Sequence, residues 1–335
     1  MKIKGSRILI TGGAGFIGSH VAESLVEAGA EVTVFDNFST GLMDNISPWE
    51  KEIKIIRGDI LDYQKLKNAF KGMDIISHHA AQLEIFLSSC HPEKDLEVNT
   101  IGTLNVLKAC KESGIKKLIN ISSACVYGQT QNATKENDDP TPNWPYGVSK
   151  LAAEKYARIF NDYENLPVIS LRYGIVYGER EWYRRVLPIF LKKIILNQPP
   201  VVFGDGRQIR DFIYVKDLVE FHNLCIERDN LNGEVFNVGS GKPTSISGLA
   251  ETAVKLSSEG LKVIYEDTIE GEFSKLVPEK KRNTAELKTM LLNMSKVEKL
   301  TGWKAKTSLI DGLKKEYLWA KDNLSRWEKV LYTVV

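Results

Sequence analysis

The sequence predicts an α/β fold in which a doubly wound parallel sheet is joined to a smaller, interleaved C-terminal α/β domain. Short β-rich runs alternate with helical stretches through the first half, which is typical of β-α-β crossovers in a parallel sheet. A glycine-rich turn separates the first predicted strand from the first predicted helix. The second half is less regular and contains no low-complexity linker, so we expect its domain to interleave with the first.

The predicted strands of the first half are short and rich in β-branched residues. They lie at 7–11, 31–36, 54–59, 74–81 and 117–122, and 167–178 is predicted as one more strand that runs into a loop. Helical stretches between them are predicted at 16–28, 62–70, 95–112 and 147–163. Strands and helices of these lengths predict a sheet that is covered by helices on both faces.

The second half mixes turns, short strands and helices. A helix is predicted over 185–198, turn-rich short strands over 199–218, a segment at 234–241 before a helix near 246–257, and two helices around a Gly-Trp turn over 295–323. We therefore expect the first domain at 1–175, with parts of 203–240 returning to it, and the second mostly at 176–335. The segment WYRR (182–185) is expected in the inter-domain core or a substrate loop.

Composition narrows the class of protein. The chain has 335 residues, 43% apolar and 26% charged, as expected of a globular protein with one large or two interleaved domains. Its 45 basic and 43 acidic residues nearly balance, which argues against nucleic acid or an anionic membrane as a partner. No apolar run approaches the ~18 residues of a membrane span. Four cysteines without C-x-x-C spacing argue against zinc or disulfides and favour a reduced, cytoplasmic enzyme.

The turn TGGAGFIG (11–18) follows a predicted strand and opens a helix, the context in which a glycine fingerprint has meaning. Gly12, Gly15 and Gly18 let the backbone approach a pyrophosphate, which then meets the amide groups at the helix N-terminus. Asp36 ends the second predicted strand, where its carboxylate can bind both hydroxyls of an adenosine ribose. A 2′-phosphate would be repelled there, so the pattern favours NAD over NADP.

The segment YGVSK (146–150) places Tyr146 and Lys150 four residues apart at the start of a predicted helix, so both face the same way. A phenol with a pKa near 10 needs a shift of about three units, or roughly 4 kcal/mol, to act as a base at neutral pH. The ammonium of Lys150 and a positively charged nicotinamide ring favour the phenolate. Ser123, at a neighbouring strand end, can bond the same substrate oxygen. The predicted chemistry is removal of a hydroxyl proton while hydride leaves for NAD.

Several motifs together resemble the extended short-chain dehydrogenase/reductases, and among them the nucleotide-sugar epimerases and dehydratases. The resemblance covers nearly the whole chain and rests on TGGAGFIG, DNFSTG (36–41), GDILD (58–62), HHAAQ (78–82), SSACVYG (122–128), YGVSK, LRYGIVYG (171–178), GDGRQIRDFIYVKDL (204–218) and GWKAKTSLIDGLKKEY (302–317). It implies a Rossmann domain with tightly held NAD, a smaller domain for a nucleoside diphosphate sugar, and a homodimer built on the helices near 95–112 and 147–163.

The resemblance also implies site residues. The catalytic positions are Ser123, Tyr146 and Lys150, with Cys125 as a further candidate. The cofactor positions, besides Tyr146 and Lys150, are Gly12, Gly15, Phe16, Ile17, Gly18, Asp36, Asn37, Ser39, Gly41, Asp59, Ile60, Ala80, Ala81, Gln82 and Asn99. The substrate positions are Ser123, Val201, Phe203 and Arg210, whose guanidinium suits a diphosphate. No metal site is expected, because His78 and His79 lack a third ligand at suitable spacing.

Three departures from the family leave the sugar open. Dehydratases of the family carry an acidic pair or a glutamate directly after the catalytic serine or threonine, where this chain has Ala124 and Cys125. Ile175 replaces a common substrate-contacting asparagine. The segment 269–283 replaces an R-x-G-D motif that supplies a second diphosphate arginine, for which Lys281 and Arg282 are the candidates.

The resulting prediction is an NAD-dependent epimerase of a nucleoside diphosphate sugar, foremost a UDP-hexose 4-epimerase that forms a transient 4-keto sugar. One alternative is a 3,5-epimerase or an unusual dehydratase in which Cys125, partly ionised beside Lys150, is the acid or base. The competing interpretation of Cys125 is a small, buried residue at a strand end. An alternative of another class is a non-catalytic cofactor-sensing protein, whose members typically lose the tyrosine or the lysine.

Overall fold

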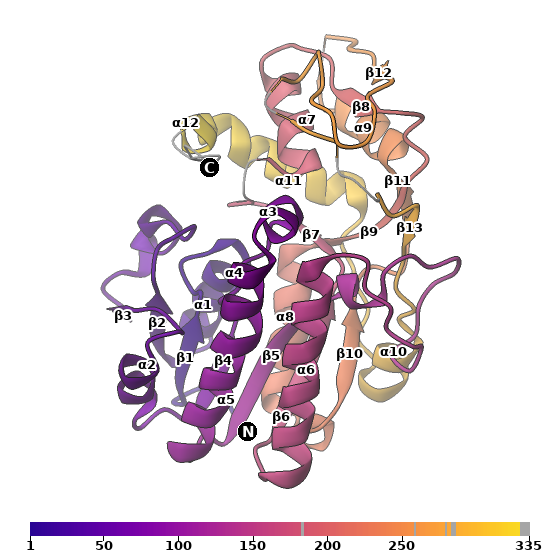
Figure 1. Ribbon diagram of the computed structural model, residues 1–335. Coiled ribbons are helices and arrows are strands. Elements are labelled where there is room, and N and C mark those ends of the chain that lie inside the picture. Colours follow the sequence, from indigo (N-terminus) through magenta and orange to yellow (C-terminus); the bar gives the residue numbers. More distant parts are fainter. Residues whose placement is uncertain (182–183, 258, 279, 283–285, 329–335) are drawn as a thin grey trace.

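The computed structural model describes residues 1–181, 184–257, 259–278, 280–282 and 286–328 (Figure 1). Its main sheet has seven parallel strands in the spatial order β10-β6-β5-β4-β1-β2-β3. These strands are β1 (Arg7–Thr11), β2 (Glu31–Asp36), β3 (Ile53–Arg57), β4 (Ile75–His78), β5 (Lys117–Ser123), β6 (Val168–Tyr173) and β10 (Val235–Val238). The order runs outward from β1 in both directions, which confirms the doubly wound α/β fold.

Helices cover both faces of this sheet, because its strands are apolar on both sides. Helices on one face are α2 (Tyr63–Phe70), α4 (Pro92–Leu96), α5 (Gly102–Glu112) and α6 (Pro145–Tyr163). The opposite face carries α1 (Phe16–Glu27), which packs against α8 (Val215–Glu227). All seven residues of the central strand β5 are buried. Even Lys117 is covered there, because its Nζ donates to the Ile226 carbonyl (2.9 Å) and pairs with Asp229 (2.8 Å).

Smaller sheets and further helices lie above the carboxyl ends of the main strands in Figure 1. Strand β9 (Ile209–Tyr214) pairs with β7 (Ile175–Tyr177), β11 (Pro243–Ser245) and β13 (Thr289–Met290), and β8 (Val201–Phe203) pairs with β12 (Ile264–Glu266). The helices here are α7 (Val186–Ile195), α9 (Ile246–Val254), α11 (Leu309–Asp322) and α12 (Leu324–Glu328), whereas α10 (Ser295–Thr301) lies beside β10 of the main sheet. Short helix α3 (Ile85–Cys90) follows the loop after β4.

The structure differs from the sequence-based elements in four places. The stretch 167–178 forms two strands in different sheets, and the change occurs at Gly174, where a Cβ would lie 3.0 Å from the Asp211 carbonyl oxygen. The strand predicted over 74–81 ends at His78. A π-helical turn over Glu97–Ile101 interrupts the helix predicted over 95–112. Helix α8 was not predicted, because it follows β9 without an intervening residue.

A buried ion pair fixes helix α6 to the sheet. Arg172 of β6 donates to both oxygens of Glu154 (2.6 and 2.9 Å), and Ser122 of β5 donates to Glu154 as well (2.8 Å). Breaking such a pair by removing one partner typically costs about 3–5 kcal/mol. The pair therefore holds the first turns of α6 in register with the end of β5.

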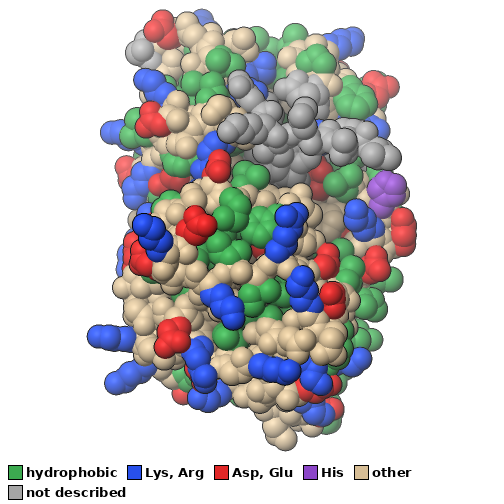
Figure 2. All heavy atoms as spheres, turned by 90° about the vertical axis from the view of Figure 1, so that its left-hand side faces the viewer, with side chains coloured by type: hydrophobic (Ala, Val, Ile, Leu, Met, Phe, Trp, Pro, Cys, Tyr) green, Lys and Arg blue, Asp and Glu red, His purple; other side chains and the backbone are tan. Residues whose placement is uncertain are grey.

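The surface carries charges of both signs. Figure 2, which views the molecule from the left-hand side of Figure 1, shows Lys and Arg side chains scattered among Asp and Glu and between hydrophobic side chains. Within the described ranges, no helix combines the length and the hydropathy that a membrane crossing requires.

Candidate active site

The loops after β1, β4 and β5 meet at the carboxyl edge of the main sheet, the usual ligand site of an open parallel sheet. The glycine turn follows β1, Ala80, Ala81 and Gln82 follow β4, and Ser123 ends β5. Helix α6 begins at Pro145, brings Tyr146 beside Ser123 and carries Lys150 one turn further along. The structure thus gathers most of the predicted site along one edge.

The glycine turn has no room for side chains at two positions. A Cβ on Gly12 (φ +67°) would lie 2.6 Å from the Ala80 amide nitrogen, and one on Gly18 would lie 2.2 Å from the Gly12 carbonyl oxygen. A Cβ on Gly15 would approach only the Gly12 oxygen, at 3.2 Å. Gly15 caps α1 without a side-chain hydrogen bond, and the first turn, which includes Phe16 and Ile17, contains no acidic residue. Its amide groups therefore fit the pyrophosphate of NAD.

The end of β2 supplies the carboxylate that was predicted for the ribose. Asp36 is 6% exposed and accepts hydrogen bonds from the amides of Ala14 (2.9 Å) and Phe38 (2.8 Å). Burial raises the pKa of this carboxyl, while the two amide bonds oppose the rise. A Cβ on Gly41 would lie 3.0 Å from both carboxylate oxygens, so the loop passes directly over Asp36.

The loop after β2 and the segment after β3 are joined by hydrogen bonds of Asn37. Asn37 Nδ2 donates to Asp59 Oδ2 (2.8 Å), and Asn37 Oδ1 accepts from the Ser39 amide (2.9 Å). Ile60 is buried in the apolar core that the main sheet forms with helices α2 and α5. Asn37, Ser39 and Asp59, predicted for the adenine side, are therefore joined by hydrogen bonds near the end of β2.

Asn99 fixes the segment after β4 through the π-helical turn. Its Nδ2 donates to the Gln82 carbonyl, its Oδ1 accepts from the Gln82 amide (2.9 Å each), and Nδ2 also reaches Asp95 Oδ1 (3.0 Å). Asp95 in turn accepts from the Ser149 hydroxyl at 2.5 Å, one residue before Lys150. Asn99 thus connects the predicted cofactor wall to the catalytic helix.

Ser123, Tyr146 and Lys150 form the predicted catalytic group. The Ser123 side chain hydrogen-bonds with Tyr146 and also accepts from the Cys125 amide (3.2 Å). Lys150 is 3% exposed; burial lowers its pKa to about 8, and the charges of Asp95 and Glu154 oppose a further fall.

Within the protein, burial raises the pKa of Tyr146 well above its usual value. The hydrogen bond with Ser123 and the charge of Arg185 lower it. Lys150, the residue expected to have this effect, is not among the main contributors. Arg185 lies just before α7 and was not among the predicted site residues, since its loop is placed only by tertiary packing.

Cys125 is 7% exposed and lies directly against Ser123. Burial raises the pKa of its thiol, and the hydrogen bond with Ser123 and the charges of Arg210 and Arg185 only partly oppose this. The thiol is therefore neutral at neutral pH, and it is not the partly ionised group that the acid-base alternative requires.

Two arginines share one carboxylate, that of Glu286. Arg210 of β9 lies 4.0 Å from Glu286, and Arg282 lies 3.3 Å from the other oxygen of the same carboxylate. Arg282 also donates to the Thr268 carbonyl (2.6 Å). The ammonium of Lys281 instead lies over the Phe86 and Phe273 rings, at 5.3 and 5.8 Å from their centroids. Of the two candidates for the second diphosphate cation, the structure brings Arg282 to Arg210.

Strand β8 borders this arginine pair. Val201 is buried with Ile189 and Val277, and Phe203 packs against that cluster. A Cβ on Gly204, the next residue, would lie 3.2 Å from the Arg282 guanidinium. Of the predicted WYRR segment, Trp182 and Tyr183 lie outside the described residues.

The two histidines at the end of β4, His78 and His79, lie in hydrogen-bonded positions. His78 bonds with Thr11 (2.7 Å) and Thr103 (3.0 Å), and burial lowers its pKa to about 3. His79 bonds with Ser77 (2.8 Å), and burial lowers its pKa as well. Both rings are therefore neutral. In the described part of the chain, no group of three or more His, Cys, Asp or Glu side chains is arranged to hold a metal ion.

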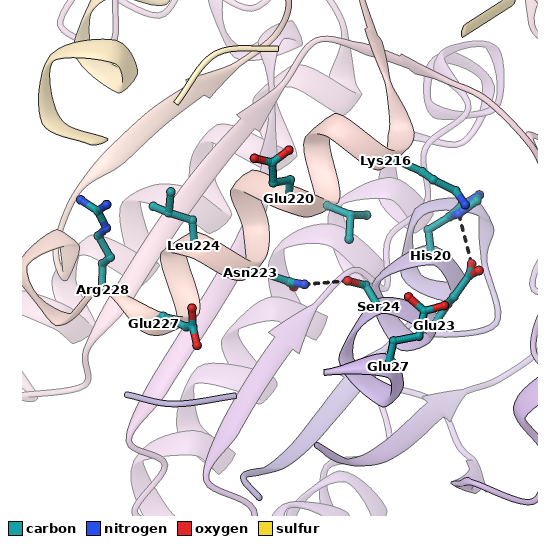
Figure 3. A pocket seen from close by; sticks show the side chains of 11 residues that line it. His20, Glu23, Ser24, Glu27, Lys216, Glu220, Asn223, Leu224, Glu227 and Arg228 are labelled. Atoms are coloured by element: carbon teal, nitrogen blue, oxygen red, sulfur yellow. Dashed lines mark hydrogen bonds and ion pairs between the residues drawn. The ribbon is translucent and has the colours of Figure 1, made fainter. Parts of the chain in front are cut away.

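A separate groove of about 510 Å³ lies between α1 and α8, the helices that cover the face of the sheet opposite to α5 and α6 (Figure 3). His20 and Glu23 face Lys216 across it, and Asn223 donates to the Ser24 hydroxyl (2.7 Å). Its walls are the outer surfaces of two helices, and none of the predicted site residues lines it.

The chain is similar to known proteins over nearly its whole length. The model of the NAD dependent epimerase/dehydratase family matches residues 8–239. A putative UDP-glucose 4-epimerase of Methanocaldococcus jannaschii is 34% identical over 94% of this chain and 99% of its own length. The crystal structure of a Thermotoga maritima UDP-glucose 4-epimerase with UDP-glucose is 31% identical, with a TM-score of 0.86, over 95% of this chain and 99% of that one.

A Bacillus cereus UDP-glucuronic acid 4-epimerase, solved with UDP-glucuronic acid and NAD, is 30% identical, with a TM-score of 0.85, over 95% of this chain and 99% of that one. The family model covers more than half of the sequence. The chain is therefore an enzyme of the NAD dependent epimerase/dehydratase family, with NAD as its cofactor.

Proposed function

We propose that the protein is a 4-epimerase of a UDP-hexose. The observation that supports this most directly is the contact of Ser123 with both Tyr146 and a neutral Cys125. Tyr146 and Ser123 supply what oxidation of a sugar hydroxyl needs, whereas the position after the serine lacks the carboxyl group that dehydratases of the family carry. The relatives named above, two UDP-glucose and one UDP-glucuronic acid 4-epimerase, support the same reaction.

The residues at the carboxyl edge of the main sheet fit the parts of NAD as follows. The amides of Phe16, Ile17 and Gly18 would hold the pyrophosphate, and Asp36 would bind the adenosine ribose. Asn37, Ser39, Gly41, Asp59 and Ile60 would line the adenine side, and Ala80, Ala81, Gln82 and Asn99 the opposite wall. When bound, NAD accepts a hydride from the sugar and returns it, and its positively charged ring favours a phenolate at Tyr146.

In the proposed mechanism, Tyr146 takes the proton from the C4 hydroxyl, and Ser123 holds the same oxygen by a hydrogen bond. Lys150 would bind the nicotinamide ribose and keep a positive charge near the phenolate. The resulting 4-keto sugar rotates about its link to the diphosphate. Tyr146 then returns the proton to the oxygen at C4, now with the opposite configuration at that carbon.

The substrate would extend from Tyr146 toward the two arginines. Arg210 and Arg282, which share Glu286, suit the diphosphate, and β8 with Val201 and Phe203 lies where the nucleoside would follow. This arrangement supports the proposed division into an NAD-binding domain at 1–175, with parts of 203–240, and a mostly substrate-binding domain at 176–335.

One experiment separates this function from its alternatives. Purified protein is incubated with UDP-glucose in D₂O, and the products are followed by NMR. A 4-epimerase forms UDP-galactose without deuterium at C3, C4 or C5, because the hydride returns directly. A 3,5-epimerase or dehydratase that uses Cys125 incorporates solvent deuterium next to the 4-keto group. A cofactor-sensing protein leaves the sugar unchanged, and a Tyr146→Phe protein serves as the inactive control.

We also propose a homodimer in the cytoplasm. Helix α6 carries an exposed apolar stripe of Val148, Tyr156, Ile159 and Tyr163, and Ile101 is exposed in the π-helical turn beside it. Contiguous apolar surface of this kind is typical of a protein interface. The cysteines of the chain are free thiols, which fits a reducing compartment.

A further inference from the structure

Helix α12, close to the C-terminal end of the chain, contacts the NAD-binding half of the molecule. Arg326 of α12 donates through Nη2 to Oδ1 of Asn45 (2.6 Å), in the short helical turn Met43–Asn45 that follows β2. The Arg326 side chain is 14% exposed, lies 5.4 Å from the centroid of the Trp319 ring and approaches Asp44 through Nε (3.9 Å). In Figure 1, α12 accordingly lies above the N-terminal half. The helix therefore reaches a loop beside the predicted cofactor site.

Asn45 connects this contact to the glycine turn. Its buried side chain donates through Nδ2 to the Ala14 carbonyl oxygen (2.8 Å). The orientation of the amide follows from its two partners, because a guanidinium can only donate and a carbonyl can only accept. The Ala14 carbonyl belongs to the same peptide group as the Gly15 amide, which donates to the Gly12 carbonyl oxygen (3.1 Å). Asn45 thus fixes the peptide group at the N-cap of α1.

The segment after β7 contacts both α12 and Asn45. Trp327, the next residue of α12, is buried and donates through Nε1 to the Glu181 carbonyl oxygen (3.0 Å). Arg180 donates through Nη1 to the Asn45 carbonyl oxygen and to the Ser19 hydroxyl of α1 (3.2 Å each). Asn45 is therefore held between three segments that are distant in the sequence, namely the glycine turn, the segment after β7 and α12.

We propose that Asn45 and Arg326 are positioning residues for the cofactor, and that α12 is a strap that slows the release of NAD. Arg326 orients the Asn45 amide, and Asn45 holds the turn that would receive the pyrophosphate. An enzyme that returns the hydride in every turnover benefits from slow release, because its cycle has no step in which NAD must leave. The inference rests on the proposed position of NAD at the glycine turn and not on the identity of the sugar.

The rate of NAD release tests the strap directly. The purified holoenzyme is mixed with alcohol dehydrogenase and ethanol, which reduce the NAD that leaves the protein, and the absorbance of NADH gives the rate. Arg326→Gln removes a charged hydrogen bond, so NAD should leave about 10-fold faster than from the wild type. Arg326→Lys, which can still donate to Asn45, should restore slow release. Lys314→Gln removes one positive charge at an exposed residue of α11 and is the matched control, with release at the wild-type rate.

A double variant tests whether Arg326 acts through Asn45. Asn45→Ala should also release NAD about 10-fold faster, and adding Arg326→Gln to it should cause no further increase. A wild-type rate of release in either single variant, or effects that multiply in the double variant, would overturn the proposal. If Asn45→Ala does not fold, the Gln and Lys variants of Arg326 decide the question alone.

Turnover separates a positioning role from general damage to the site. With NAD added in excess, Arg326→Gln should reach a kcat for UDP-glucose within about twofold of the wild type, because no reacting group is changed. A kcat that stays low in saturating NAD would overturn the positioning role. If the wild-type protein does not epimerise UDP-glucose but the two variants release NAD faster, the 4-epimerase is wrong and the strap stands. If it does epimerise UDP-glucose and all variants release NAD at the wild-type rate, the strap is wrong and the 4-epimerase stands.

Discussion

Cys125 lies where the nature of the side chain decides between reaction types. Its thiol touches Ser123, is nearly inaccessible, and is kept neutral because burial raises its pKa. A neutral thiol is a poor base, so we expect Cys125→Ala to retain kcat/KM for the UDP-sugar within about threefold while losing about 1 kcal/mol of stability for the buried atom removed. Initial rates and urea unfolding of the two proteins check both numbers.

The same variant can contradict this expectation in a specific way. A loss of more than about 100-fold in kcat, with an unchanged unfolding midpoint, would show that the thiol takes part in proton transfer. Cys125→Ser is the matched control, because a hydroxyl keeps the size of the side chain but has a far higher pKa than a thiol. Rates of both the Ala and the Ser variant close to that of the wild type confirm a packing role.

Among the site residues, the sequence predicts those whose positions follow from a single helix or strand. Tyr146 and Lys150 are one helical turn apart, and Ser123 ends a strand, so their meeting requires only the α/β pattern. Arg282 and Arg185 could not be placed in this way. Both come from loop segments whose position depends on packing against Gly204 and Val176. The role of Asn99 depends on a π-helical turn, for which an apolar periodicity gives no signal.

The β1–α1 turn is the element with the strictest steric demands. Gly18→Ala would place a Cβ 2.2 Å from the Gly12 carbonyl oxygen, so we expect a loss of about 3 kcal/mol in the free energy of unfolding. Gly15→Ala is the matched control, since its Cβ meets only one atom, at 3.2 Å, and should cost less than about 1 kcal/mol. Urea denaturation of the two variants and the wild type measures the difference.

The amount of NAD that the Gly15→Ala and Gly18→Ala proteins retain distinguishes an effect on folding from an effect on cofactor binding. Gly15→Ala should fold normally but release its NAD, because the added methyl group stands where the pyrophosphate approaches the backbone. The NAD content of the purified proteins, measured after heat release, gives this readout. A Gly15→Ala protein with full NAD content would contradict the proposed position of the pyrophosphate.

Helix α11 and the segment after β7 are joined by two buried carboxyls. Glu181 is 2% exposed and Glu316 fully buried, and they interact directly. Oε2 of Glu181 and both oxygens of Glu316 have no donor among the described residues. Two buried carboxyls that face each other favour a shared proton. Burial raises the pKa of Glu181 to about 7 and that of Glu316 well above its usual value, and the Gly178 amide only partly opposes this. Glu179 adds negative charge beside them, and Arg185 offsets part of it.

This pair makes stability fall as the pH rises. An ordinary glutamate in the unfolded chain loses its proton near pH 4.3, whereas the folded pair keeps its proton to about pH 7 or above. Between these values the folded state holds more protons, so the free energy of unfolding decreases by up to about 1.4 kcal/mol per pH unit for each retained proton. We expect the unfolding midpoint in urea to drop clearly between about pH 5.5 and about pH 8.

Glu316→Gln tests the cause of that pH dependence. The amide can donate to Glu181 without a shared proton, so the fall in stability over the same pH range should shrink by about half or more. Glu272→Gln, at an exposed glutamate, is the control and should follow the wild type. Parallel curves for all three proteins would show that the pair does not hold a shared proton.

The elements themselves could largely be predicted where a turn separates them. Strands β1 to β5 are short apolar runs bounded by glycine or polar residues, and each lies close to its predicted position. Prediction failed where one element passes directly into another. The apolar run 167–178 reads as one strand although it changes sheets at Gly174, and β9 continues into α8 without a glycine or proline to mark the boundary.

At the scale of the whole molecule, distant segments of the chain complete one structure. Strand β10, from the second half, pairs with β6 at the edge of the main sheet, and the N-terminal ammonium pairs with Asp229 (2.9 Å). These contacts span much of the chain, so the order of the last strand cannot be read from local patterns. The arginines proposed for the diphosphate likewise come from β9 and from the segment before β13.

The proposed dimer is tested on the exposed apolar stripe of α6 and the neighbouring turn. Ile101 and Ile159 are 46% and 47% exposed in the isolated chain, and burying them between two copies would offset the cost of leaving them in water. Charged residues in such an interface are strongly unfavourable, so the Ile101→Glu, Ile159→Glu double variant should sediment as a monomer of 37.7 kDa while the wild type sediments at twice that mass. Leu318→Glu is the matched control, because Leu318 is 52% exposed on α11, away from this stripe. The Leu318→Glu protein should remain dimeric. If the wild-type protein sediments as a monomer at micromolar concentration, the proposed dimer is wrong. If the Leu318→Glu protein dissociates, the interface lies on α11 and not on α6.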